Sequence, residues 1–219
     1  MKLQVFSLFL AGSLLVGCGS RTVPMARTVA PPVAAQAFRA QANTALFPYQ
    51  KGQSLVYNIT LNPVNDPMVE EKGEYTLRVE EVNKKPNATE IVFRASSSFG
   101  GKYQYPRLQE SASGTRLLDA TFLGLGAEEV RGLQVDFLHK DFKTGQRWED
   151  ENWIAKVKGQ ENVQVPAGSF KAWKIEVIGT FERAYTAVGD YWIVPGVGIV
   201  KSVLTQPGWH VTSELQRKP

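Results

Sequence analysis

The fold is decided by SLVYNITL, residues 54–61, in which every second side chain is apolar. The apolar side chains are Leu55, Tyr57, Ile59 and Leu61. Asn58 and Thr60 occupy positions between them and point to the other face of an extended chain. This period of two is typical of a β-strand with one face buried and the other in water.

The same alternation recurs along the chain from residue 47 onward, in 75–79, 91–95, 133–137, 173–177 and 209–215. Parallel strands that are buried on both faces read as continuous apolar runs, so the alternation favours an antiparallel sheet. We predict an all-β domain of about ten strands with few helices. Its single sheet is expected to be strongly curved, as a barrel or half-barrel. Only residues 120–132 suggest a short helix or a long loop.

Proline and glycine mark the expected turns. Val165–Gly168 has Pro at the first corner and Gly where a positive φ is needed, and Val194–Val197 fits a type II turn. A shared Gly-Gln pattern predicts three further turns, at Lys51–Gln53, Thr144–Gln146 and Lys158–Gln160.

Length and charge bound the class of protein. The chain has 219 residues, of which 43% are hydrophobic and 21% charged, which suits one globular domain with a tail. The net charge of +4 comes from residues 1–46, which hold four of the 25 bases and none of the 21 acids. Residues 47–219 are therefore balanced, and we expect no nucleic-acid partner, which would need a basic surface stripe.

The N-terminus reads as a targeting signal. Residues 3–16 are apolar or small, and the stretch is too short for an ordinary membrane-spanning helix. It ends in Leu15-Val16-Gly17-Cys18, which resembles the bacterial lipobox. The resemblance implies a signal peptide over 1–17, diacylglycerol transfer to the Cys18 sulfur, cleavage before Cys18, and acylation of the new amino group with a palmitate-like chain. A simple secreted protein or a spanning anchor is the alternative.

The lipidated Cys18 would begin a flexible basic tether over 18–46 that leads to the β domain of 47–219. An alternative is that the Ala-rich stretch 33–46 docks on the domain as a helix. The residue after the cysteine is Gly19 rather than Asp, which by resemblance implies the outer membrane of a two-membrane bacterium. The expected location is thus the bacterial cell envelope, with membrane lipid as a partner through Cys18.

Four segments carry a second resemblance: FPYQKGQSLVYNIT (47–60), TGQRWEDENW (144–153), VPAGSFKAWKIEV (165–177) and YWIVPGVGIVKSV (191–203). Together they resemble a poorly characterised group of bacterial envelope β-proteins, many of them lipoproteins. Leu55 departs from that pattern, which usually has an aromatic there. The group is similar in shape to the lipoprotein-localisation carriers (LolA/LolB-like), which implies a concave apolar face for acyl chains but no catalytic residues.

The sequence carries little support for catalysis. Cys18 is the one cysteine, and His139 and His210 are the two histidines, so a zinc site or Cys–His catalysis is not expected. We therefore expect a protein that is not an enzyme and has no cofactor or metal. A carboxylate-dependent hydrolase that uses Glu149 or Asp150 is the unfavoured alternative.

Aromatic side chains are the remaining candidates for binding. We predict ligand contacts for Trp192, Trp173, Trp153, Tyr103 and Tyr105, with core filling as the alternative. Trp192 is singled out because Tyr191 and Ile193 point opposite to it, which makes both faces of its strand apolar. The favoured function is a lipid-anchored, non-enzymatic envelope protein that binds an apolar ligand or an envelope partner. The alternative is a structural or assembly factor that acts through sheet edges without a pocket.

Overall fold

A computed structural model describes residues 45–66, 68–119, 134–151, 153–181 and 185–217. Cys18, the signal peptide, all but the last two residues of the tether and the segment 120–132 lie outside these ranges. Within them, twelve strands and no helix are found, where the sequence predicted about ten strands. The strands are β1 (Ser54–Pro63), β2 (Glu71–Lys85), β3 (Ala88–Ser97), β4 (Arg107–Ser111), β5 (Gly114–Leu117), β6 (Val135–His139), β7 (Arg147–Asp150), β8 (Trp153–Val165), β9 (Gly168–Phe181), β10 (Tyr185–Val194), β11 (Gly198–Gln206) and β12 (Trp209–Leu215).

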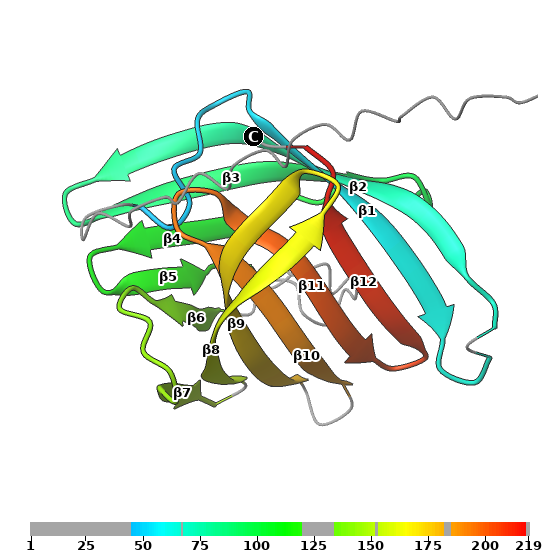
Figure 1. Cartoon of the computed structure of the whole chain (residues 1–219). Coiled ribbons are helices and arrows are strands. Elements are labelled where there is room, and N and C mark those ends of the chain that lie inside the picture. Colours follow the sequence, from blue (N-terminus) through cyan, green and yellow to red (C-terminus); the bar gives the residue numbers. More distant parts are fainter. Residues whose placement is uncertain (1–44, 67, 120–133, 152, 182–184, 218–219) are drawn as a thin grey trace, which may run out of the picture. The chain divides into compact units, whose positions relative to one another are not determined.

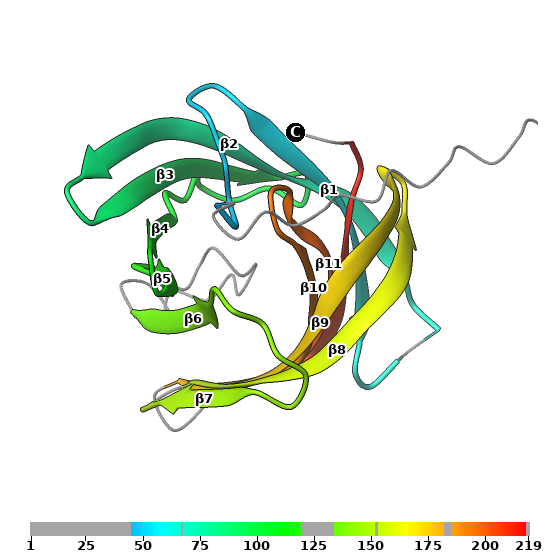
Figure 2. The same cartoon turned by 60° about the vertical axis from the view of Figure 1, so that its left-hand side comes forward.

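All twelve strands belong to one antiparallel sheet, in the order β6-β5-β4-β3-β2-β1-β12-β11-β10-β9-β8-β7. Consecutive strands pair with each other, except β6 and β7, which are the two edges of the sheet. In addition, β1 pairs with β12 and so joins the two ends of the domain at the middle of the sheet. The sheet curves round until its edge strands approach each other (Figures 1 and 2). It is nearly closed as a barrel, which confirms the predicted fold class.

The predicted alternation is confirmed in the strands that the structure describes. Leu55 and Tyr57 of β1 and Leu77 of β2 lie inside the barrel and are at most 5% exposed. Phe93 of β3 is completely buried with them. The apolar faces of the strands therefore make one continuous core within the curved sheet.

The two edge strands are joined by side chains. The Trp148 indole of β7 donates from Nε1 to the carbonyl oxygen of Asp136 of β6 at 3.0 Å. The Asp136 amide in turn donates to Oδ2 of Asp150 at 3.2 Å. His139, expected on the apolar face, is exposed at the end of β6, and its ring stacks on Trp148 with 4.9 Å between centroids. We call these contacts the β6–β7 seam.

Both predicted hairpin turns are confirmed. In the first, Val165 pairs with Gly168, which has φ of 129°. In the second, the Val197 amide donates to the Val194 carbonyl at 2.9 Å, and Gly196 has φ of 83°, as a type II turn requires.

The Gly-Gln pattern has a structural cause at two of its three sites. In the turn before β1, Oε1 of Gln53 accepts from the Gln50 amide at 2.9 Å. In the turn before β7, Oε1 of Gln146 accepts from the Lys143 amide at 3.0 Å. In each case the glutamine side chain thus stabilises the turn that precedes the strand.

The third Gly-Gln segment is not a turn, which corrects the prediction. Gly159 lies inside β8, at a bulge in the pairing with β9, and its φ is 136°. The bulge bends the β8–β9 hairpin. At the tip of this hairpin, the Ala167 amide donates to the Leu215 carbonyl at the end of β12 at 3.0 Å.

Residues before β1 close one end of the barrel. Leu46, Phe47 and Tyr49 are 2%, 1% and 6% exposed, although no periodicity marks them in the sequence. The Tyr49 hydroxyl donates to the Val197 carbonyl at 3.2 Å, and the Leu46 amide donates to the buried Glu110 carboxylate. We call Leu46–Tyr49 the plug. Leu46, predicted as the last residue of the tether, is thus part of the core.

Candidate functional site: a cavity inside the barrel

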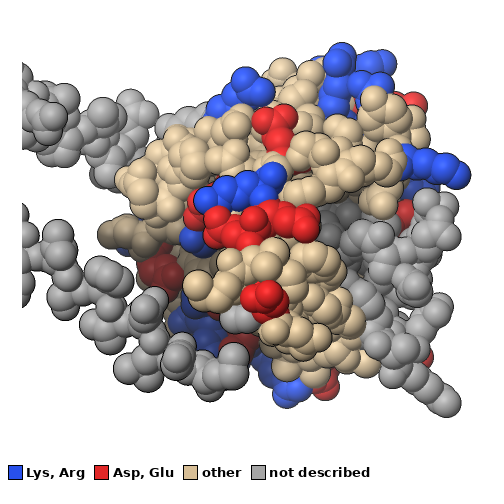
Figure 3. All heavy atoms as spheres, turned by 90° about the vertical axis from the view of Figure 1, so that its right-hand side faces the viewer, with Lys and Arg blue, Asp and Glu red and all other residues tan. Residues whose placement is uncertain are grey.

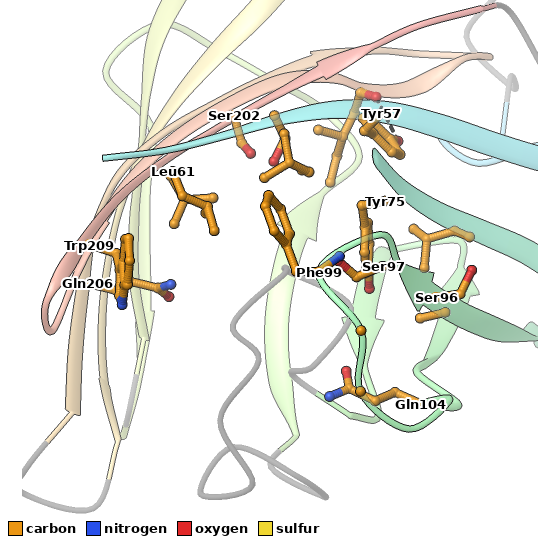
Figure 4. A pocket seen from close by; sticks show the side chains of 18 of the residues that line it. Tyr57, Leu61, Tyr75, Ser96, Ser97, Phe99, Gln104, Ser202, Gln206 and Trp209 are labelled. Carbon is orange, nitrogen blue, oxygen red and sulfur yellow. Dashed lines mark hydrogen bonds between the residues drawn. The ribbon is translucent and has the colours of Figure 1, made fainter. Parts of the chain in front are cut away.

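A cavity of about 430 Å³ lies inside the barrel. Its lining comes from β1, β2, β3, β10, β11 and β12, and from the loop that follows β3 (Figure 4). The lining residues are Tyr57, Ile59, Leu61, Tyr75, Leu77, Ala95, Ser96, Ser97, Phe99, Gly100, Gly101, Lys102, Gln104, Tyr191, Ile199, Ser202, Gln206, Trp209, Val211 and Ser213. This volume falls within the range of about 300–1,000 Å³ that small-molecule sites occupy.

The charge of the lining lies on one side of the cavity. The wall formed by β1, β11 and β12 presents aliphatic side chains, among them Ile59, Ile199 and Val211, together with the neutral polar side chains of Ser202, Gln206 and Ser213. The side formed by β3 and the loop after it presents Ser97 and the exposed Lys102, with other polar residues. Such a lining suits a ligand with an apolar body and one polar end.

Two tyrosines lie side by side on β1 and β2 in the lining of the cavity, since Tyr57 pairs with Tyr75. The Tyr57 hydroxyl donates to the Ile199 carbonyl at 3.0 Å. The buried Tyr75 hydroxyl has no hydrogen-bond partner among the described residues. Burial raises the pKa of both hydroxyls above the ordinary tyrosine value, and the charge of Asp119 adds to the rise at Tyr75, so both hydroxyls stay neutral.

Phe99 projects its ring into the cavity between Leu61 and Tyr57 (Figure 4). Room for this ring comes from Gly73, because a Cβ on Gly73 would lie 2.6 Å from Cζ of Phe99. The side chain of Phe99 is nevertheless 42% exposed, so it lies at the mouth. Gly100 and Gly101 follow it with φ of 88° and 105°, which makes this loop conformation specific to glycine.

Replacing Gly73 by Ala is therefore expected to displace Phe99 and open the mouth. The atoms that the new methyl group meets belong to the Ser98 and Phe99 side chains, which can move, so unfolding free energy should fall by only about 1 kcal/mol. For an apolar ligand that enters through this mouth, stopped-flow measurement with a fluorescent fatty acid should show faster binding and release. The control is Gly52→Ala, where a Cβ meets nothing within 4 Å. Unchanged rates would contradict the role given to Phe99.

The structure places the five aromatic candidates outside the lining of this cavity. Trp153 is 2% exposed and packs edge-on against Phe137, and half-buried Trp173 packs against Phe142. Tyr103 and Tyr105 are 60% and 56% exposed on the loop after β3, on either side of the lining residue Gln104. Their contact with a ligand stays a prediction.

Trp192 lies on the outer face of the sheet, since its neighbour Tyr191 lines the cavity. It is 8% exposed, because the Lys174 and Lys201 ammonium groups lie 4.9 and 5.9 Å from its ring centroid. Its Nε1 donates to Oε1 of Glu161 at 2.6 Å. These contacts give a structural reason for an apolar residue on the polar face, while ligand binding by Trp192 stays a prediction.

The acids proposed for hydrolysis do not line the cavity. Glu149 and Asp150 are exposed on β7, where Glu149 lies next to Arg147 and Asp150 takes part in the β6–β7 seam. Among the described residues, no three of His, Cys, Asp and Glu gather where they could hold a metal ion. The same part of the chain contains no helix long and apolar enough to cross a membrane.

Sequence reasoning found part of this lining and missed the rest. Leu61, Tyr75 and Val211 were expected on the inner face, and they do line the cavity. Phe99 and Lys102 were missed, because they lie in a loop where no periodicity applies. The glycine pair between them was the available signal, since consecutive glycines permit a backbone that approaches a ligand closely.

The described residues thus define an antiparallel β-barrel domain with an internal, mostly apolar cavity. Two solved structures are similar to it. One, from Bacteroides fragilis, is described as a "putative exported protein with YmcC-like fold"; it has 15% sequence identity and a TM-score of 0.58, over 80% of this chain and 99% of that one. The other is a "putative lipoprotein" from Parabacteroides distasonis, with 15% identity and a TM-score of 0.55 over the same shares.

At 15% identity these likenesses show the fold. No protein-family model matches the chain, and no curated protein matches it either. The names of both neighbours agree with the expected class of exported, lipoprotein-like envelope proteins. Neither is described as a lipoprotein-localisation carrier, so the likeness to those carriers stays a prediction.

Proposed function

We propose that this protein is a lipid-anchored, non-enzymatic protein of the bacterial cell envelope that binds an apolar ligand inside its barrel. The observation that carries the proposal is the cavity of about 430 Å³, whose lining includes the aliphatic side chains of Ile59, Leu61 and Val211. Apolar surface that leaves water on binding contributes about 25 cal/mol per Å², so such a wall favours a hydrocarbon.

The anchor and the location rest on the lipobox-like Leu15–Cys18 and on Gly19. Acylation of Cys18 would hold the protein at the outer membrane, with membrane lipid as its partner, because two or more acyl chains bind stably where one does not. The names of the two structural neighbours support export. On the flank in Figure 3, basic and acidic side chains lie next to each other, which supports the absence of a nucleic-acid partner.

An assembly factor without a ligand is the second candidate function. It is favoured by three exposed apolar side chains on the outer face: Ile178 and Val188, which pair directly between β9 and β10, and Val203 on β11. Such a factor should lose its envelope partner when Val188 is replaced by Asp, whereas a ligand-binding protein should keep its ligand. The hydrolase alternative has less support, because its acids do not line the cavity.

The experiment that tests ligand binding fills the cavity. Ser213 of β12 pairs with Ile59 and Ser202, both of which line the cavity, so Ser213→Phe should project a ring into it. Because the new ring occupies space that the ligand needs, we expect the variant to bind a fluorescent fatty acid at least about tenfold more weakly than the parent. A tenfold change in Kd corresponds to a loss of about 1.4 kcal/mol of binding free energy. Fluorescence titration measures the Kd.

The matched control is Thr212→Phe, which adds a similar ring one residue away on the outer face, where Thr212 pairs with Val203. Ser213→Leu provides a smaller, graded filling if Ser213→Phe folds poorly, which circular dichroism would show. Equal Kd values for the parent and both well-folded Ser213 variants would overturn binding in the cavity.

A further inference from the structure

Given the proposed ligand binding, we infer that the ligand is a single-chain amphiphile with an anionic head, which Lys102 at the mouth recognises. Free fatty acids and lysophospholipids with an acidic headgroup share this chemistry. The proposal rests on the single charge of the lining, on its position at the mouth and on one unpartnered hydroxyl.

Lys102 is the one charged residue among the described residues that line the cavity. It is exposed, which places it at the mouth, and it forms no ion pair with any residue that the structure describes. Some lysines of the barrel do have partners, such as Lys174 with Asp190 at 3.1 Å and Lys201 with Glu214 at 2.6 Å, while others that lie away from the cavity, such as Lys171, form no ion pair with a described residue. What sets Lys102 apart is therefore its place in the lining. A lysine left without an acid beside an apolar cavity favours a ligand that supplies the negative charge.

Lys102 also lies in a short loop that is fixed at both ends. At one end the Ser98 amide donates to the Glu74 carbonyl at 2.9 Å, and at the other Ala95 and Gln104 exchange backbone hydrogen bonds of 2.8 and 3.3 Å. Between them, Gly100 and Gly101 carry the chain from Phe99 to Lys102. The ring that covers the mouth and the charge that would receive the head are therefore three residues apart on one loop.

Tyr75 supplies the second polar position. It lines the cavity on the same side as Ser97, with which it pairs, and its buried hydroxyl has no hydrogen-bond partner among the described residues. A buried hydroxyl without a partner is destabilising, and an oxygen atom of a ligand would satisfy it. Since its raised pKa keeps Tyr75 protonated, it can donate.

The volume of the cavity suits a ligand with a single hydrocarbon chain. The cavity of about 430 Å³ lies toward the lower end of the range of about 300–1,000 Å³ for ligand sites. The aliphatic wall of Ile59, Leu61 and Val211 suits a hydrocarbon tail, and the Lys102 side suits its head.

The test compares probes that share one tail but differ in the head: palmitate, hexadecanol and palmitoyl-lysophosphatidylglycerol, at pH 8, each displacing a fluorescent fatty acid from the full chain. Palmitate should bind about fivefold more tightly than hexadecanol, the most that an exposed ion pair usually provides. In Lys102→Gln this ratio should fall to about one, while Lys171→Gln, which removes another exposed lysine, should keep it. Tyr75→Phe should weaken both probes about fivefold without lowering the stability of the unliganded protein.

The outcomes separate the two proposals. If none of the probes binds, the cavity binding proposed above fails. If palmitate and hexadecanol bind equally to the parent, or if Lys102→Gln keeps their ratio, the cavity stands and the anionic head is overturned. Tighter binding of the lysophospholipid than of palmitate would identify a membrane lipid as the source of the chain, and the reverse order a free fatty acid.

Discussion

Gly198→Ala is expected to lower the free energy of unfolding by about 3–5 kcal/mol. Gly198 begins β11 with φ of 105°, where an alanine is strained. A Cβ there would also overlap the Tyr49 hydroxyl and lie 3.1 Å from Cδ1 of Phe47, both in the plug. Because the plug is buried, it cannot move aside without leaving the core. Urea denaturation of the protein measures the loss.

The control separates backbone strain from displacement of the plug. Gly52 has φ of 86°, but a Cβ there meets nothing within 4 Å, so Gly52→Ala should cost only about 1–2 kcal/mol. In a Tyr49→Ala background, the cost of Gly198→Ala should fall close to that of Gly52→Ala, since the overlap with the hydroxyl is gone and only the 3.1 Å contact with Cδ1 of Phe47 remains. Equal costs for the two glycine variants in the parent protein would show that the plug does not pack as described.

The burial of the plug could not be predicted from the sequence. The alternation in residues 54–61 predicted which side chains of β1 are buried, because a period of two follows from strand geometry alone. Leu46 and Phe47 precede that strand and have no period, so nothing in the sequence distinguished them from the tether. Their burial depends on the barrel end that β1 and β11 form, which is a long-range property.

Strand number was underestimated for a related reason. β5 and β7 contain four residues each, too few for an alternating pattern to be recognised. The prediction of the candidate site was less successful than the prediction of the strands. Trp192 and Trp153 were chosen as aromatic residues of particular strands, whereas the cavity is defined by which faces meet after the sheet closes. Phe99 and Lys102 reach it from a loop.

The second large expected effect concerns the β6–β7 seam, where the barrel closes. Trp148→Ala is expected to lower the free energy of unfolding by about 3–5 kcal/mol, because it removes a large side chain that is 7% exposed. It also leaves the Asp136 carbonyl without its indole donor and His139 without its stacking partner. Hydrogen exchange should be fastest in β6, whose outer edge is held by side chains alone among the described residues.

Two variants show whether the seam, rather than aromatic bulk in general, closes the barrel. Trp148→Phe keeps an aromatic ring but loses the hydrogen bond to Asp136, and should cost about 1 kcal/mol for that bond. Trp209→Ala removes the same side chain from a half-buried position at the cavity, and should leave exchange in β6 unchanged. Since β6 and β7 lie at opposite ends of the sheet order, an increase in exchange that is larger in β6 than in the central strands after Trp148→Ala indicates that the seam has opened. Exchange in β6 that is the same in Trp148→Ala as in the parent would mean that these contacts do not hold the barrel closed.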